Sequence, residues 1–240
     1  QSVLARLAAS IYSDSDSRFV LSGMAADMFR GADSAAGPNS ARALTLSVAP
    51  ELTVDSQGTK FISTGALDVN SAKFWGVEAA AEWRSLYGQA GYFDYDVDQR
   101  VAAPAASKPD VNFHGWYAQA TWVLTGESRT YSTANAAFTA PKPSIPFSLN
   151  GGGWGAWELA GRYSDTDLND VVGEAAHSAP YGGVRGGEQK IWTAGVNWYP
   201  NSVLRFTLDY QWMDVDRLSA SGANVGQKLQ ALSFRSQIAL

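Results

Sequence analysis

Hydrophobic and polar positions alternate along most of this chain with a period of two. The clearest case is the stretch 191–212, IWTAGVNWYPNSVLRFTLDYQW, where every second residue is apolar on both sides of the turn YPNS. Trp192 and Phe206 belong to the apolar series, whereas Arg205 and Asp209 lie between its members. Because strand side chains alternate between two faces, this pattern predicts a hairpin with one apolar, aromatic-ended face and one hydrophilic face.

The same alternation predicts seven further strands, so that nine are expected in total. Their ranges are 3–11, 18–30, 73–84, 86–97, 112–124, 154–164 and 227–240. The strand at 86–97 has no clear facing, because Tyr87, Tyr92, Phe93 and Tyr95 fall on both parities.

Short turns and longer segments separate these strands. The turns lie at 14–17, near Ser85 and at 200–202, and the longer loops lie at about 31–71, 165–187 and 217–226. A candidate small hairpin occupies 44–54 within the first loop. The segment 125–153 is rich in Pro, Gly, Ser and Thr, which predicts irregular structure.

The apolar strand faces need an environment that covers them. A soluble β-sandwich would bury them, whereas an outer-membrane barrel would expose them to lipid. Trp75 and Trp83 end the apolar face of one strand, eight residues apart. At about 3.3 Å per residue and a tilt of roughly 40°, that spacing climbs about 20 Å, close to the apolar band of about 25 Å in such barrels. The match favours lipid.

We therefore predict an all-β fold, a transmembrane antiparallel β-barrel of about nine or more strands, in one domain over residues 1–240. If the C-terminus is periplasmic, parity places every short turn on the periplasmic rim, as is typical of such barrels. The segment 125–153 is the exception, since it is long but falls on the short-turn side. The sequence begins at Gln1 inside a strand-like alternation, so we expect it to be processed or truncated.

Composition removes several classes of function. The chain has 240 residues, a net charge of −5 and no cysteine, which excludes disulfides, thiolate metal sites and a cysteine nucleophile. Lys and Arg are scattered, so no basic stripe for nucleic acid is expected. No window approaches 18 consecutive apolar residues, so no transmembrane helix is predicted.

The hydrophilic strand faces supply the candidate site. The predicted pore-lining residues are Glu78, Glu82, Arg84, Glu158, Arg162, Arg205, Asp209 and Arg235. Four basic and four acidic groups leave no net charge to select ions. The apolar faces supply a predicted membrane girdle of Trp75, Trp83, Trp116, Trp122, Trp192, Trp198 and Trp212.

Other candidate chemistry is weaker. Asp94, Asp96 and Asp98 could collect a divalent cation, but no calcium-loop glycine accompanies them, which favours a solvated strand end. His114 and His177 are 63 residues apart and have no metal-binding or triad pattern around them. The glycine-rich stretches lack a following Gly-Lys-Ser/Thr, so they predict loops and not a phosphate cradle. No metal, cofactor or catalysis is predicted.

Several blocks also carry a family resemblance. The segments TGALDVNSAKFWGVEAAAEW, TWVLTGESRTY, GGWGAWELAGRYSDTDLND and GGEQKIWTAGVNWYPNSVLRFTLDYQWMDVDR resemble the phosphate-selective porin O and P family. The resemblance covers residues 65–240 well and the first 64 loosely. It implies a 16-stranded barrel, here strands 8 to 16, and a homotrimer in the Gram-negative outer membrane. It also implies an arginine ladder and a lysine cluster, whose positions lie mostly outside the matched part.

The resulting hypothesis is an outer-membrane porin that passes small hydrophilic solutes or ions, anions such as phosphate among them, by passive diffusion. Outer-membrane lipid and lipopolysaccharide would surround it, and either 31–71 or 125–153 would narrow the pore. Two alternatives stay open. The barrel could be a structural or docking anchor for an envelope partner, or the chain could be a soluble carbohydrate-binding sandwich.

Overall fold

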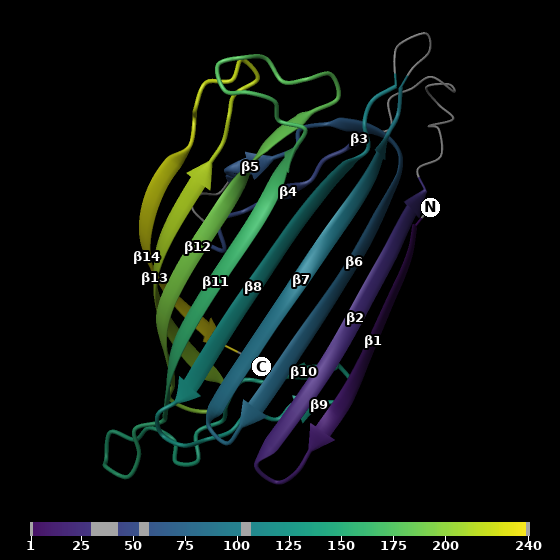
Figure 1. Ribbon diagram of the computed structural model, residues 1–240. Helices are drawn as coiled ribbons and strands as arrows, with labels where there is room; N and C mark the ends of the chain where they lie inside the picture. Colours follow the sequence, from purple (N-terminus) through teal and green to yellow (C-terminus); the bar gives the residue numbers. More distant parts are fainter. Residues whose placement is uncertain (1, 30–42, 53–57, 102–106, 239–240) are drawn as a thin grey trace.

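The computed structural model describes residues 2–29, 43–52, 58–101 and 107–238. Nine long strands form one antiparallel sheet, in the order β1-β2-β6-β7-β8-β11-β12-β13-β14 (Figure 1). Their bounds are β1 (Ser2–Ser13), β2 (Ser17–Phe29), β6 (Leu67–Trp83), β7 (Leu86–Gln99), β8 (Val111–Val123), β11 (Ala156–Asp170), β12 (Val184–Tyr199), β13 (Leu204–Asp216) and β14 (Gln227–Ile238). The all-β prediction is confirmed.

Five very short strands lie outside this order. They are β3 (Ala43–Leu44), β4 (Ser47–Val48), β5 (Ile62–Ser63), β9 (Tyr131–Ser132) and β10 (Ala137–Phe138). β3 pairs with β6, β4 pairs with β5, and β9 pairs with β10. A helix long and apolar enough to cross a bilayer is absent from the described part of the chain.

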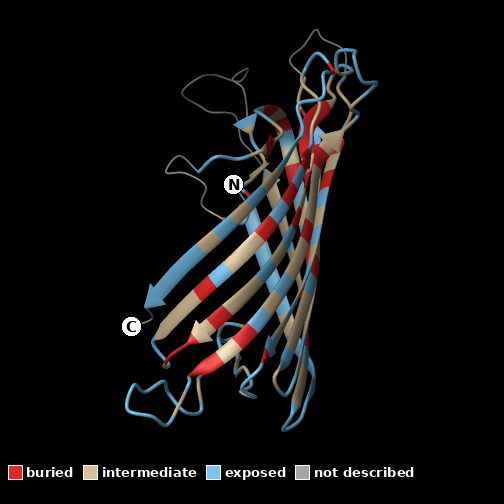
Figure 2. Cartoon of the chain, turned by 90° about the vertical axis from the view of Figure 1, so that its left-hand side faces the viewer, coloured by how far each residue is buried: buried red, intermediate tan, exposed pale blue. Residues whose placement is uncertain are grey.

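The sheet curves and its strands tilt, so that it forms part of a barrel wall (Figures 1 and 2). Neighbouring strands along the sheet are mostly consecutive in the chain, joined alternately at two rims. The connections 14–16, 84–85, 124–155 and 200–203 define the turn rim. The connections 30–66, 100–110, 171–183 and 217–226 define the loop rim. The segment 125–153 thus lies on the turn rim, as parity predicted.

Several predicted boundaries differ from the structure, and β12 begins at Val184, inside the predicted loop 165–187. β6 begins six residues earlier than expected, and β11 continues to Asp170. Both extensions are rich in polar residues. They lie closer to the loop rim than the aromatic residues of the outer face, and there apolar residues no longer alternate in the way that predicts a strand. The predicted hairpin at 44–54 is wrong, since Ser47 pairs with Ser63 and Val48 with Ile62; Val54 lies outside the described residues.

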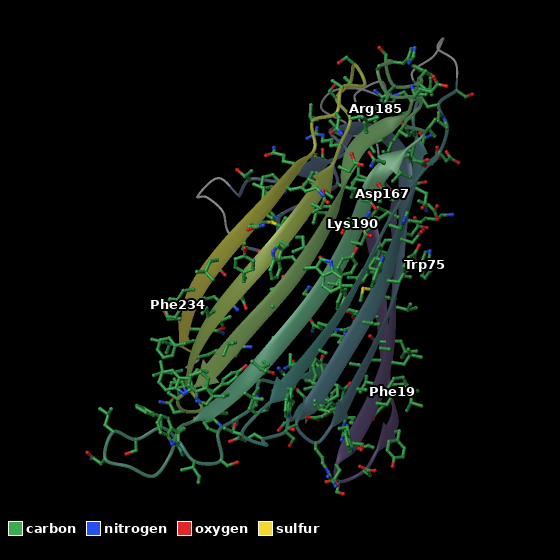
Figure 3. All side chains as sticks on the ribbon, turned by 60° about the vertical axis from the view of Figure 1, so that its left-hand side comes forward. Phe19, Trp75, Asp167, Arg185, Lys190 and Phe234 are labelled. Atoms are coloured by element: carbon green, nitrogen blue, oxygen red, sulfur yellow. The ribbon has the colours of Figure 1, made fainter. Side chains whose placement is uncertain are left out.

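The wall has two chemically distinct faces. The outer face carries exposed apolar side chains, among them Leu7 at 78%, Trp192 at 60% and Phe234 at 68%. In a soluble protein such a face would be covered. Phe19 and Phe234 project from it at opposite sides of the view in Figure 3.

The opposite, inner face is the one against which residues 43–52 and 58–65 fold. These two stretches are called the inserted segment. Ile62, with no exposed area, lies at the centre of its contact with the wall. The surrounding dry cluster comprises Leu67, Val69, Ala72, Val97, Val111, Phe113, Leu168, Val184 and Val215. It occupies the inner face toward the loop rim, where Figure 2 shows buried residues gathering.

The inner face also settles the facing of β7. Tyr87 pairs with Glu82 and Phe93 pairs with Gly76, so both point inward with the acidic residues of β6. Tyr92 points outward, where its ring lies 5.5 Å from that of Trp75. Aromatic residues therefore line both faces of β7, which is why alternation alone gave no answer.

Arg185 joins the connections of the loop rim. Its guanidinium donates to the backbone carbonyls of Val172 and His177, both at 2.8 Å, and of Ser219 at 3.0 Å. The side chain is buried, and these partners lie in the two loops that flank β12 and β13. One arginine thereby fixes both loops above the wall (Figure 3).

Candidate functional site: the inner face of the wall

A chain of polar side chains crosses the middle of the inner face. Tyr117 donates to Glu78 at 2.5 Å, and Gln89 donates to the Tyr117 hydroxyl at 2.7 Å. Gln119 donates to Gln89 at 3.0 Å and accepts from Arg162 at 2.8 Å. These five residues come from β6, β7, β8 and β11 and form the mid-wall network. Alternation places them on one face, and the antiparallel register brings them side by side.

Arg162 connects the mid-wall network to the inserted segment. Its Nε atom lies 3.0 Å from Oε1 of Glu51, and its guanidinium carbon lies 4.2 Å from the ring centroid of Tyr117. Farther up, Arg217 donates to the Phe61 carbonyl at 3.4 Å. The inserted segment is thus held by an ion pair below and by the dry cluster above.

A second polar group, the turn-rim cluster, surrounds Glu158. This carboxylate has no exposed area, and it accepts hydrogen bonds from Asn197 at 3.0 Å and Tyr199 at 2.8 Å. Arg129, from the connection 124–155, reaches into the wall and pairs with Glu158. The backbone amide of Arg129 also donates to Glu82. One loop residue therefore bridges two inner-face carboxylates, as expected where buried charges require partners.

The arginines of β13 and β14 are in a different situation. Arg205 donates to Asn197 Oδ1 at 2.8 Å, and Arg235 pairs in register with Thr207. Within the described ranges, neither forms an ion pair within 4.0 Å. Their positive charge stays available to the space inside the wall.

Seven of the eight residues predicted to line the pore lie on the inner face, but Arg84 does not. It follows the last residue of β6, in a left-handed conformation with φ of 52°. Its side chain is 67% exposed and lies 3.4 Å from Asp16 in the neighbouring turn. The alternation of β6 stops at Trp83, so parity could not be carried one residue farther. Arg84 belongs to the turn rim.

The seven predicted girdle tryptophans lie on the outer face. Trp75, Trp83, Trp116, Trp122, Trp192 and Trp212 are each at least 42% exposed. Trp198 also lies on the outer face but is less exposed than the other six, because neighbouring rings cover it. The ring centroids of Trp157 and Phe206 lie 5.6 and 5.5 Å from its own, and that of Phe147 lies at 5.3 Å.

Two parts of the connection 124–155 lie on opposite sides of the wall. Its β9–β10 hairpin folds against the inner face, where Phe138 lies 5.1 Å from Tyr87 and the guanidinium of Arg18 lies 5.0 Å from the Tyr131 ring. Farther on, Phe147 packs outside the wall on Trp198. The connection therefore partly fills the mouth at the turn rim and wraps around its edge.

Two carboxylates outside the membrane-spanning strands have shifted pKa values. Hydrogen bonds from Tyr12 and from the amides of Asp16 and Ser17 lower the pKa of Asp14 in the first turn. Partial burial would raise the pKa of Glu127, but hydrogen bonds from Thr125 and the Ser144 amide outweigh it and lower that pKa. Both groups are therefore ionised anchors of the turn rim.

The other candidate groups form no site. Asp94, Asp96 and Asp98 face outward, and Asn112 donates to Asp94 at 3.0 Å and to Asp96 at 2.9 Å. No group of three or more potential metal ligands occurs among the residues that the structure describes. His114 lies on the outer face beside Tyr92.

Alternation identified the wall but missed the residues that complete its polar clusters. Arg129 and Glu51 come from connections without periodicity, so no parity argument reaches them. The one available signal was indirect: Glu82 and Glu158 share the hydrophilic face, and buried carboxylates need cationic partners.

Comparison with known proteins supports the same family. The family model for phosphate-selective porin O and P matches residues 23–240. An uncharacterized protein of Caulobacter vibrioides is 34% identical over 161 residues, covering 67% of this chain and 28% of that protein. A protein named Porin O from Pseudomonas aeruginosa is 30% identical over 147 residues, covering 60% of this chain and 30% of that protein. The matched part is thus less than a third of each relative.

Solved structures of an outer membrane protein, OmpT of Vibrio cholerae, are also similar. The in-vitro folded form aligns with a TM-score of 0.45 and 12% identity over 99% of this chain and 55% of that chain. Its trimer form aligns with a TM-score of 0.46 and 13% identity over 99% and 56%. From the family model and the Porin O relative, the chain belongs to the phosphate-selective porin O and P family, in the outer membrane of Gram-negative bacteria.

Proposed function

We propose that this protein is a porin through which small hydrophilic solutes and ions diffuse along the inner face. The observation that carries the proposal is the contrast between the faces. Polar side chains such as Arg205 and Asp209 lie inside, while exposed aromatic and aliphatic side chains such as Trp192 and Phe234 lie outside. A wet interior within a lipid-facing wall is the arrangement of a barrel channel.

The inner charges support a weak preference for anions. Arg129 is neutralised by Glu158, and Arg162 by Glu51. Arg205 and Arg235 face the lumen without ion pairs in the described part of the chain, with Asp209 as the nearby acid. Charged side chains that line a pore set its ion preference. A preference for phosphate over other anions would need more positive charge than these strands provide.

The remaining parts of the proposal concern size and assembly. β1 and β14 are the edges of the described sheet. Unpaired backbone groups are costly in hydrocarbon, so we propose that further strands close the barrel. The resemblance to the family implies sixteen strands in total and three copies in a trimer, and we include both in the proposal. The inserted segment narrows the lumen on the loop side, and the β9–β10 hairpin narrows it at the turn rim.

The test is ion selectivity in planar bilayers under a potassium chloride gradient. We expect the Arg205→Glu/Arg235→Glu double variant to shift the reversal potential toward cation preference, because two lumen charges reverse sign. Arg84→Glu is the control, since it makes the same Arg-to-Glu substitution once, in an exposed turn, and its reversal potential should stay at the wild-type value.

The outcomes separate the alternatives. An unchanged reversal potential in the double variant would contradict the assignment of these arginines to the conducting path. Absence of conductance in the wild-type protein would favour a structural or docking barrel instead. A chloride current that inorganic phosphate blocks would add phosphate preference to the proposal.

A further inference from the structure

We propose that the inner wall carries a binding track for neutral sugar rings, formed by Tyr95, Phe74, Phe93 and Tyr117. The inference rests on the proposed function, because it identifies a class of solute for the same lumen. These four aromatic residues are named the aromatic track. They come from β6, β7 and β8, and all point to the inner face.

The rings of the aromatic track follow one another along the wall. The centroids of Tyr95 and Phe74 are 4.6 Å apart, those of Phe74 and Phe93 are 6.0 Å apart, and those of Phe93 and Tyr117 are 6.1 Å apart. The planes of the last two pairs differ by only 11° and 14°. Phe74, Phe93 and Tyr117 therefore have nearly the same orientation, and the guanidinium of Arg162 lies over the Tyr117 ring at the lower end of this apolar surface.

Glycines opposite the rings let them lie flat on the wall. Phe93 is paired in register with Gly76 on one side and Gly115 on the other, and Tyr117 is paired with Gly91. A Cβ atom at Gly76 would lie 2.6 Å from Cδ1 of Phe93, and one at Gly91 would lie 2.7 Å from Cε1 of Tyr117. Any larger residue there would push the ring away from the wall. Gly76 and Gly91 thus leave the space that the Phe93 and Tyr117 rings occupy against the wall.

Polar side chains border the aromatic track in the way that sugar hydroxyls require. Glu78, Gln89, Gln119 and Arg162 belong to the mid-wall network at its lower end, and together they offer both donors and acceptors. Planar rings with such a border bind pyranose rings by stacking on C–H faces and by hydrogen bonding to hydroxyls.

The charge balance favours a neutral solute. The positive charge of Arg162 is paired with Glu51 at 3.0 Å. Glu78 accepts from Tyr117 and lies 3.8 Å from Arg6. With both charges offset locally, the border attracts hydroxyl groups without selecting an anion or a cation.

There is room for such a solute beside the rings. A cavity of about 440 Å³ lies between the inserted segment and the wall, lined by Phe74, Phe93, Tyr95 and Tyr117 together with Arg162 and Thr166. This volume falls within the range of about 300–1,000 Å³ that is typical of small-molecule sites.

The experiment measures the block of potassium chloride current by added sugar in planar bilayers. Glucose and maltotriose are the probes, and sorbitol is the control because it has comparable hydroxyls but no ring. We expect maltotriose to block best and sorbitol not to block. The Phe74→Leu/Phe93→Leu variant keeps apolar bulk but removes two ring faces, so its affinity for maltotriose should fall roughly tenfold. Phe19→Leu, on the outer face, is the matched control.

The outcomes distinguish this inference from the proposed function. Normal conductance without sugar block, or equal block in the double variant and the wild type, would overturn the aromatic track and leave the porin intact. If the protein does not conduct, calorimetry with maltotriose on detergent-solubilised protein decides the question. Ring-dependent binding there would support the track alone, and no binding would overturn both.

Discussion

Glu158 is a carboxylate that has lost all contact with solvent. Its donors come from two places: Asn197 and Tyr199 on the adjacent strand, and Arg129 in the connection 124–155. Replacing it by Ala would remove the carboxylate that balances the charge of the Arg129 guanidinium and would remove the acceptor of the Asn197 amide and the Tyr199 hydroxyl. We expect Glu158→Ala to destabilise the folded barrel by about 3–5 kcal/mol, measured by denaturant unfolding in detergent micelles.

A solvent-exposed glutamate gives the control for this substitution. The Glu174 side chain is 89% exposed in a loop-rim connection, so Glu174→Ala should change stability little. Equal stability of the two variants would mean that the turn-rim cluster does not hold the connection in place.

Residue-scale prediction from sequence succeeded where periodicity holds. Alternation put Glu158 and Arg162 on the hydrophilic face, and the structure places them on the inner face. It could not provide their partners, because Arg129 and Glu51 lie in segments whose path depends on tertiary contacts. Arg84 marks the limit at a strand end, where a single left-handed residue ends the alternation.

At the scale of elements, the inserted segment depends on one apolar side chain. Ile62 is completely buried in the dry cluster, whereas the polar ties of the segment to the wall are few: the two-residue pairing of β3 with β6, the contacts at Glu51 and Phe61, and a hydrogen bond from Gln189 to the Ala49 carbonyl at 3.5 Å. We expect Ile62→Ala to weaken docking of the segment by about 2–5 kcal/mol. The segment would then leave the lumen part of the time, and single-channel recordings should show larger and noisier conductance.

An exposed leucine provides the comparison. Leu149 is 90% exposed at the turn rim, so Leu149→Ala should leave conductance at the wild-type level. If Ile62→Ala conducts as quietly as Leu149→Ala, the inserted segment does not restrict the pore.

Strands were predictable and the inserted segment was not, for a physical reason. A membrane strand repeats the same two environments at every step, so its sequence carries a period. The segment meets a different surface at each residue. Its short pairing of Ser47 with Ser63 joins positions that no local turn connects.

At the scale of the whole molecule, all nine tryptophans lie on the outer face or at the turn rim. Their positions predict that lipids with brominated acyl chains quench most of the tryptophan fluorescence in proteoliposomes. Iodide, which stays in water, should quench little. The reverse result, strong quenching by iodide and weak quenching by brominated lipid, would contradict the assignment of outer and inner faces.

The dry cluster makes the two ends of the wall differ in stiffness. Packed apolar side chains resist compression, and they occupy only the half nearest the loop rim. The turn rim depends on polar contacts from a single connection and has much less apolar packing. Turgor that strains the envelope would therefore deform the mouth at the turn rim first, while the half nearest the loop rim keeps its diameter.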